Sequence, residues 1–222
     1  MPAASAFRSL TSMNFMSFTL HRLKKRIGII VAITTDWALF IGIVLLLGLG
    51  SSWYMVEKGS PLTTTTVGPW VSWISAGRTD ADPYTRAFEA RTGTLPLSTD
   101  VSQTFMAQAD SEGRTLHSSC DYVLEGHEMP SFWWSLTVFD AEGRLIPNTL
   151  GRSVFTSDTM VLNPNGSYAV TLSRDAQPGN WLPIGGAGRL TLAFTVLDLG
   201  TRAVAQDDDI EKAIPTITRK GC

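Results

Sequence analysis

Charged side chains are scarce in this sequence. They make up 17% of its 222 residues, whereas soluble globular domains average about 25%. Cysteine occurs only twice and never as the lipobox cysteine of a lipoprotein, which excludes that form of membrane attachment. A Gly-x-Ser-x-Gly nucleophile elbow is missing, and the glycine-rich run at 185–188 precedes an expected strand instead of a helix. These absences argue against a hydrolase elbow and a phosphate loop, so we expect no catalytic residue and no cofactor.

The few charges are unevenly placed. Residues 1–26 carry five basic side chains and no acidic one, whereas residues 57–222 carry 13 basic and 19 acidic side chains, a formal net charge of −6. A nucleic-acid-binding domain needs a basic face on its folded part. We therefore expect no nucleic-acid partner.

A long apolar stretch in the first quarter of the chain predicts a transmembrane helix. Ile27–Leu49 could cross a hydrocarbon core of roughly 30 Å at about 1.5 Å per residue, but Asp36 would then lie near the bilayer centre at a cost of roughly 2.5–3.5 kcal/mol. A second register, Trp37–Val56, puts Asp36 at the cytoplasmic boundary and Trp53 at the opposite interface. The cost favours the second register, and the first stays open.

The basic residues that precede this stretch predict its orientation. Four of them, at positions 22 and 24–26, stand just before it, whereas the opposite charges of Glu57 and Lys58 beyond it cancel. The positive-inside rule then puts the N-terminus in the cytoplasm and the rest outside. A cleaved signal peptide is the alternative, but the apolar run exceeds the usual 7–15 residues, so we expect an uncleaved signal anchor.

Three residues are candidate contacts with a membrane partner: Asp36, Trp37 and Gly42. Asp36 either faces a partner helix, or snorkels or caps without one. Gly42 permits close helix contact, although glycine is common in membrane helices. Contact of integral membrane subunits with residues 1–56 is therefore a hypothesis.

The pattern divides the chain into four segments. We expect a basic cytoplasmic segment 1–26, a transmembrane anchor 27–56, a linker and lead-in 57–82, and a folded domain 83–222. The threonine run at 63–66 fits an extended linker.

A short helix is predicted after this linker. Asp82 and Pro83 suit its N-cap and first position, and Gly93 lies past its end near Arg91. Tyr84 and Phe88 share one face. We expect them to dock the helix on a sheet, with an aromatic ligand pair as the alternative.

From residue 95 onward the pattern predicts strands and turns. Trp134, Leu136 and Val138 alternate with polar residues, and Leu145 continues the apolar face beyond a turn at 140–143. A turn is also expected at 163–166, and a short helix at 207–213, where the three aspartates could alternatively hold calcium. Candidate strands are 103–109, 121–125, 133–140, 160–162, 167–173 and 190–197. The predicted fold is mainly β, a jelly-roll-like β-sandwich preceded by one N-terminal transmembrane helix and a short helix.

Cys120 and Cys222 both fall on the proposed outer side, where an oxidising compartment favours a disulfide between them. Two free thiols, or pairing of Cys222 with another chain, are the alternatives. His117, Cys120 and His127 lack the spacing and fourth ligand of a zinc site, so we expect no metal.

Four residues are candidate ligand-binding residues: Asn148, Arg152, Asn180 and Trp181. An arginine, two amides and an indole could hold a carboxylate or a sugar at the mouth of a jelly roll. The alternative is structural, with Arg152 bracing loops and Asn180 satisfying backbone groups.

Several motifs resemble, in order, the family called domain of unknown function 1214. They are Trp134-Ser135-Leu136-Thr137-Val138-Phe139-Asp140, Pro147-Asn148, Arg152, Gly166-Ser167, Asn180-Trp181-Leu182-Pro183 and the strand 190–197. Short membrane-anchored members from Gram-negative bacteria share further motifs: Gly68-Pro69-Trp70, Ala81-Asp82-Pro83-Tyr84-Thr85-Arg86-Ala87 and Gly221-Cys222. The resemblance covers about residues 45–222 and implies a jelly-roll-like periplasmic domain anchored in the inner membrane. It brings no established activity, and the extension up to about residue 30 departs from such members.

Two functions are consistent with this pattern. The first is a non-enzymatic accessory or assembly subunit of an inner-membrane protein complex, whose partners are the lipid bilayer and integral membrane subunits. The second is an enzyme or binding protein for a small polar or carbohydrate envelope ligand.

Overall fold

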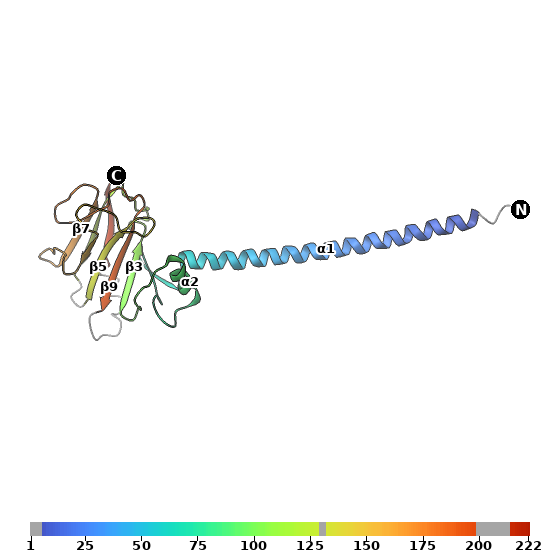
Figure 1. The fold of residues 1–222 in the computed structure, drawn as a ribbon, viewed down its shortest axis with the longest axis horizontal. Helices are drawn as coiled ribbons and strands as arrows, with labels where there is room; N and C mark the ends of the chain where they lie inside the picture. The colour runs from blue at the N-terminus through green and yellow to red at the C-terminus, as the bar shows by residue number, and fades with distance from the viewer. Residues whose placement is uncertain (1–5, 129–131, 199–213) are drawn as a thin grey trace. The chain divides into compact units, whose positions relative to one another are not determined.

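The computed structural model describes residues 6–128, 132–198 and 214–222, and the chain forms two compact units, Met1–Tyr54 and Met55–Cys222. Helix α1 (Ala6–Lys58) comprises 53 residues (Figure 1). Its part Ile30–Lys58 is long and apolar enough to cross a membrane by length and composition. The hydroxyls of Thr34 and Ser51 donate to carbonyl oxygens three residues back, which satisfies polar groups where lipid offers no partner. These features support single-pass anchoring, while its register and orientation stay predictions.

The second unit is mainly β and contains two sheets, as predicted. The strand order is β1-β2-β3-β9-β5-β6 in one sheet and β10-β4-β7-β8 in the other. The six-stranded sheet contains β1 (Thr64–Val67), β2 (Trp70–Trp73), β3 (Ser102–Ala107), β9 (Thr191–Asp198), β5 (Phe132–Phe139) and β6 (Val154–Thr156). The four-stranded sheet contains β10 (Thr216–Gly221), β4 (Asp121–His127), β7 (Ser167–Ser173) and β8 (Asn180–Pro183). Only β7 and β8 pair in parallel among the described strands. That the strands are connected in the order of a jelly roll stays a prediction.

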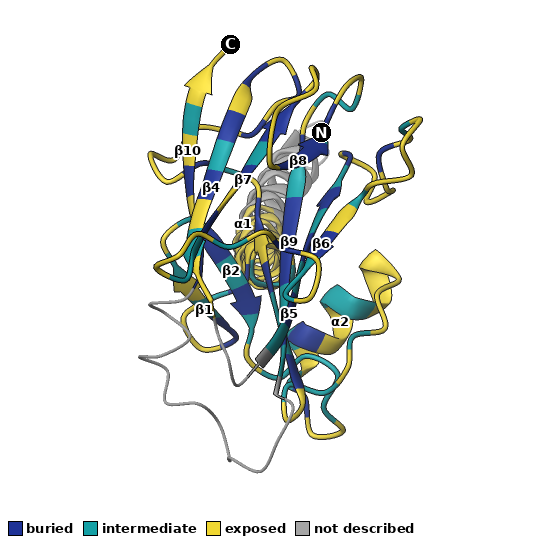
Figure 2. Cartoon of the chain, turned by 90° about the vertical axis from the view of Figure 1, so that its left-hand side faces the viewer, coloured by how far each residue is buried: buried dark blue, intermediate teal, exposed yellow. Residues whose placement is uncertain are grey.

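One hydrophobic core lies between the sheets, and strand β5 contributes its central side chains. Trp134, Leu136 and Val138 are all buried, which confirms the predicted alternation, and Figure 2 shows buried and exposed segments alternating along the strands. The Trp134 ring stacks on the ring of Tyr168 from β7, with centroids 4.8 Å apart. This aromatic pair joins the two sheets across the core.

The prediction for Leu145 is wrong. Its side chain is exposed, and the neighbouring Ile146 is buried in its place. Only an isolated bridge to Phe139 follows the turn, and because no strand continues there, the period-two pattern does not extend beyond it.

The predicted short helix is confirmed as α2 (Pro83–Thr92). The Asp82 carboxylate accepts from the N–H groups of Tyr84 and Thr85, and Gly93 adopts the left-handed conformation that ends the helix. The Phe88 ring stacks on Trp73 of β2, with centroids 4.5 Å apart. The docking role expected for Phe88 is therefore confirmed.

The segment expected as a linker differs from expectation. Thr64–Val67 and Trp70–Trp73 form β1 and β2, and β2 pairs with β3. The threonines show no apolar alternation, but β2 supplies their hydrogen-bond partners and itself pairs with the edge of β3, which local sequence does not reveal. Trp70 is buried and donates from Nε1 to the carbonyl oxygen of Pro215 at 2.7 Å.

Residues 160–162 form no strand, in contrast to the prediction. The side-chain amide of Asn180 takes the place of a neighbouring strand, because it accepts from Val161 N and donates to Val161 O, both at 2.9 Å. The turn at 163–166 is confirmed by the bond from Gly166 N to Asn163 O at 2.9 Å. The helix predicted at 207–213 lies outside the described residues.

The predicted disulfide between Cys120 and Cys222 is present and joins residues 102 apart in the sequence. It connects the residue before β4 to the residue after β10, and these two strands pair antiparallel. The C-terminal strand is thereby fastened by both hydrogen bonds and a covalent link.

A five-residue turn motif, Asp-x-Glu-Gly-Arg, occurs twice, at 110–114 and 140–144. In each copy the aspartate accepts from the backbone N–H groups two and four residues later and from the arginine Nε. The sequence pattern predicts a turn only at the second copy. The copies differ in burial, since the side chain of Asp110 is fully buried and that of Asp140 is 11% exposed.

Replacement of Gly126 tests the close contact between β4 and Tyr168. A Cβ atom there would lie 2.5 Å from the Tyr168 hydroxyl and 2.6 Å from its ring. Because stacking on Trp134 holds this ring, we expect Gly126→Ala to lower the free energy of unfolding by about 1–3 kcal/mol. Gly185→Ala is the control, since its Cβ would meet its nearest atom at 3.8 Å. Equal urea midpoints for the two variants would contradict the packing of Tyr168.

Candidate functional site

Two of the four predicted ligand-binding residues, Asn148 and Arg152, lie in the loop before β6. The Asn148 amide donates to the carbonyl oxygens of Ile146 at 3.1 Å and Arg152 at 2.9 Å. Its oxygen accepts from Arg152 N at 2.9 Å. The guanidinium of Arg152 lies over the Phe155 ring, 5.7 Å from its centroid. These contacts close the loop and direct the chain into β6.

The other two, Asn180 and Trp181, begin β8. Asn180 is buried, and besides the two bonds to Val161 its amide donates to Ala169 O at 3.1 Å. Trp181 donates from Nε1 to Ser173 O at 3.1 Å. The polar atoms of both side chains are therefore engaged with backbone groups.

The four residues do not form one site by their described contacts. Arg152 precedes β6, which is an edge strand of the six-stranded sheet, whereas Asn180 and Trp181 belong to β8, an edge strand of the four-stranded sheet. Their hydrogen bonds favour the structural alternative. The ligand-binding role of these residues stays a prediction.

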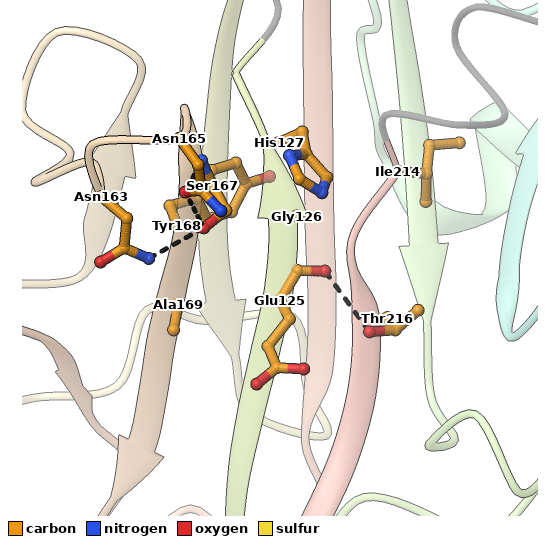
Figure 3. Close-up of a pocket in the computed structure, with 10 residues that line it drawn as sticks. All are labelled: Glu125, Gly126, His127, Asn163, Asn165, Ser167, Tyr168, Ala169, Ile214 and Thr216. Atoms are coloured by element: carbon orange, nitrogen blue, oxygen red, sulfur yellow. Dashed lines mark hydrogen bonds between the residues drawn. The ribbon is translucent and has the colours of Figure 1, made fainter.

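A pocket of about 430 Å³ lies across β4, β7 and the start of β10. In Figure 3, Glu125, Gly126 and His127 run along the centre, with the 163–167 segment on one side and Ile214 and Thr216 on the other. Its lining residues are Glu125, Gly126, His127, Asn163, Asn165, Ser167, Tyr168, Ala169, Ile214 and Thr216. The pocket thus belongs to the four-stranded sheet and not to the predicted site.

The polar groups of the pocket fall into two sets. Asn163, Asn165 and Ser167 bond to one another, with Ser167 Oγ 2.7 Å from Asn165 Oδ1 and 2.9 Å from Asn163 Nδ2. Glu125 and His127 are exposed and, two residues apart on one strand, point to the same face about 7 Å apart. Their carboxylate and imidazole suit a small ligand that bears hydroxyl or amine groups.

Tyr168 lies beneath this surface with its hydroxyl against Gly126. The hydroxyl is buried and has no hydrogen-bond partner among the described residues. Burial raises the pKa of this phenol above its usual value, so the hydroxyl stays protonated at neutral pH. Tyr168 therefore contributes packing against Trp134 and no charge to the pocket.

The sequence contains one signal for this pocket, the alternation of β4. Alternation along 121–127 places the side chains of Glu125 and His127 on one face of β4, opposite Tyr122 and Leu124, which are buried. The predicted strand 121–125 stops short of His127, whereas β4 continues to that residue. The neighbouring positions of β7 and β10 come from pairing that is distant in sequence.

Residues 101–199 match the family described as "Protein of unknown function (DUF1214)". No curated protein matches the chain. The VPA0106 protein from Vibrio parahaemolyticus has a similar structure, with a TM-score of 0.52 and 20% identity over 78% of this chain and 42% of its own. An uncharacterized protein from Burkholderia cenocepacia has a TM-score of 0.43 and 15% identity, over 78% of this chain and 40% of its own. The chain thus spans about two fifths of the length of these proteins, and the first likeness shows the fold alone.

Proposed function

We propose, for a chain whose residues 101–199 belong to the DUF1214 family, that it is a membrane-anchored accessory or assembly subunit of an inner-membrane protein complex. Helix α1 spans the bilayer once, with the N-terminus in the cytoplasm and the β domain in the periplasm. The protein acts through binding, without catalysis, and residues 1–56 contact its integral membrane partners.

The length of α1 is the observation that carries this proposal. Its 53 residues extend about 80 Å at 1.5 Å per residue, whereas a bilayer core of roughly 30 Å needs about 20 residues. The helix begins at Ala6, 21 residues before the apolar stretch that starts at Ile27. An anchor alone needs no such extension, but a subunit uses it to pack against partner helices.

Asp36 provides a second argument. Asp36 lies in the apolar part of α1, and in the register Ile27–Leu49 it would be near the bilayer centre, where an ionised carboxylate is costly and is usually paired or functional. A basic or hydrogen-bonding group on a partner helix would remove that cost.

Purification from native membranes in mild detergent tests the proposal. We expect the full chain to co-purify with integral membrane proteins at a fixed ratio. We expect Asp36→Leu to reduce their recovery by about tenfold or more, since 1.4 kcal/mol corresponds to a factor of ten. Deletion of residues 6–20 keeps the basic cluster that sets the orientation, and we expect it to reduce recovery as well.

Thr34→Leu is the matched control on the same helix. Its hydroxyl is satisfied within the helix by Val31 O at 2.9 Å, so recovery of partners stays unchanged. A full chain that always runs as a single species of monomer mass by light scattering would contradict a role as a subunit. If partner proteins are recovered with Asp36→Leu but not with the deletion of residues 6–20, the contact lies in the helical extension and not at Asp36.

The alternative function is binding or turnover of a small polar or carbohydrate ligand. The pocket on β4, β7 and β10 favours it, because Glu125 and His127 present a carboxylate and an imidazole beside a wall of amides and hydroxyls. The support therefore comes from residues other than the four predicted from the sequence.

A further inference from the structure

Large apolar side chains are exposed on the part of the second unit between α1 and β3. Leu62 is 85% exposed, Leu95 98% and Leu97 59%, and Ile74 and Val101 are exposed as well. Single exposed apolar residues are normal on protein surfaces, whereas a group of them marks an interaction site. We call these five residues the lead-in patch.

Backbone hydrogen bonds hold the segments of the lead-in patch together. Ile74 N donates to Thr63 O at 3.0 Å, which places Leu62 next to β2. Thr99 donates from N to Ala76 O at 3.1 Å and from Oγ1 to Ile74 O at 3.0 Å. The segments around residues 62, 74 and 99 therefore lie side by side.

The chain ties this patch to the end of α1 in two ways. Leu62 follows Lys58, the last residue of α1, by four residues. Glu57, in the last turn of α1, forms an ion pair with Arg91 of α2, and Leu95 follows Arg91 by four residues. Four residues span at most about 14 Å, so both leucines lie close to the point where α1 ends.

We propose that the lead-in patch rests on the outer surface of the lipid bilayer, at the boundary between headgroups and acyl chains. This inference rests on the proposed function in one respect, namely that α1 spans the membrane. Trp53 and Tyr54, near the end of α1, suit the interfacial region. Leu62, within about 14 Å of that end, lies within reach of the boundary, where apolar side chains enter about 5–10 Å deep.

The occupant is the bilayer and not a second protein because of this connection. Every copy of the chain carries Leu62 four residues after Lys58, the last residue of α1, so contact with lipid needs no partner. Leu150 and Val161 are also exposed, but no short connection to α1 places them at the membrane. They are therefore natural internal controls.

Photolabelling of the full chain in nanodiscs tests the inference. The discs contain phosphatidylethanolamine and phosphatidylglycerol with a small fraction of a phospholipid that bears a diazirine near the glycerol. Trypsin then yields peptides 59–78 and 92–114, which contain the patch, and peptides 145–152 and 153–174, which contain Leu150 and Val161. We expect about tenfold more lipid adducts on the first pair, because only groups within about 5–10 Å of the boundary meet the label.

A variant with Leu62→Ser, Leu95→Ser and Leu97→Ser supplies the second measurement. These side chains are exposed, so the fold persists, and we expect adducts on peptides 59–78 and 92–114 to fall to the level of the controls. Adducts on α1 without adducts on the patch peptides would overturn the inference and leave the anchor intact. Absence of adducts from α1 would overturn the proposed function. Crosslinks between patch peptides of two copies, without lipid adducts, would assign the patch to a second chain and overturn the inference.

Discussion

Cys222→Ser should lower the free energy of unfolding of this protein by about 4–5 kcal/mol. The disulfide from Cys120 joins residues 102 apart, and the loop-closure entropy of an unfolded chain with a loop of that size accounts for about this amount. For a protein of this length, 1 kcal/mol shifts Tm by about 2–4 °C, so a decrease of about 10–20 °C is expected. Urea unfolding of the full chain in detergent, followed by near-UV circular dichroism, measures the effect.

The double variant Cys120→Ser, Cys222→Ser is the control for the free thiol that the single variant leaves. It should be destabilised as much as Cys222→Ser, and a reductant should affect the wild type but not the double variant. A reduced wild type with an unchanged urea midpoint would contradict the role of the disulfide. A dimer on non-reducing gels that disappears in Cys222→Ser would instead show pairing between chains.

Asp110→Ala should lower the free energy of unfolding by about 3 kcal/mol, a usual effect of breaking a buried, hydrogen-bonded charge pair. The Asp110 carboxylate accepts from the N–H groups of Glu112 and Arg114 and from Arg114 Nε. It also pairs with Arg219 of β10, whose Nε lies 3.4 Å away. The turn binds β10 further, because Ser111 N donates to Ile217 O and Ile217 N donates to Ser111 Oγ, both at 2.9 Å.

The matched control is Asp140→Ala, in the second copy of the same turn. Asp140 has the same local donors, but it forms no described bond to a distant strand, and its arginine is 72% exposed. A smaller loss of stability than for Asp110→Ala is therefore expected. Equal urea midpoints for the two variants would show that the turn, and not its connection to β10, determines the effect.

The effect of Asp110 should also depend on pH. Burial alone would raise the pKa of this carboxyl, but hydrogen bonds from the Arg114 and Glu112 N–H groups and the Arg114 guanidinium outweigh burial and lower it. The stabilisation is therefore complete above the unfolded pKa of about 3.9 and is lost as pH falls through the lower folded value. The stability difference between wild type and Asp110→Ala should be constant near neutral pH and shrink below about pH 4.

Local sequence was sufficient for several features of this protein. The apolar stretch of α1, the caps of α2 and the alternation along β5 each follow from contacts within a few residues, because helix and strand periods appear directly in the residue pattern. The pairing of the two cysteines follows from their number and proposed compartment. Local sequence therefore predicts the residue bounds of these elements nearly correctly.

Other features depend on partners that are far away in the chain. The threonine-rich segment forms β1 because it pairs with β2, which itself pairs with the edge of β3. Residues 160–162 form no strand because the Asn180 amide bonds to Val161. The pocket combines positions from β4, β7 and β10 that only strand register brings together. Sequence periodicity contains no information about which strands pair.

The two Asp-x-Glu-Gly-Arg turns show most clearly which features local sequence determines and which depend on distant contacts. The five residues and their local hydrogen bonds are nearly the same in both copies, so the sequence alone predicts equal turns. Arg219, more than 100 residues later in the chain, reaches Asp110, and among the described residues Asp140 has no equivalent distant partner. The motif sets the turn because its donors lie within four residues, and the packing of β10 sets which copy is buried because that contact exists only in the folded chain.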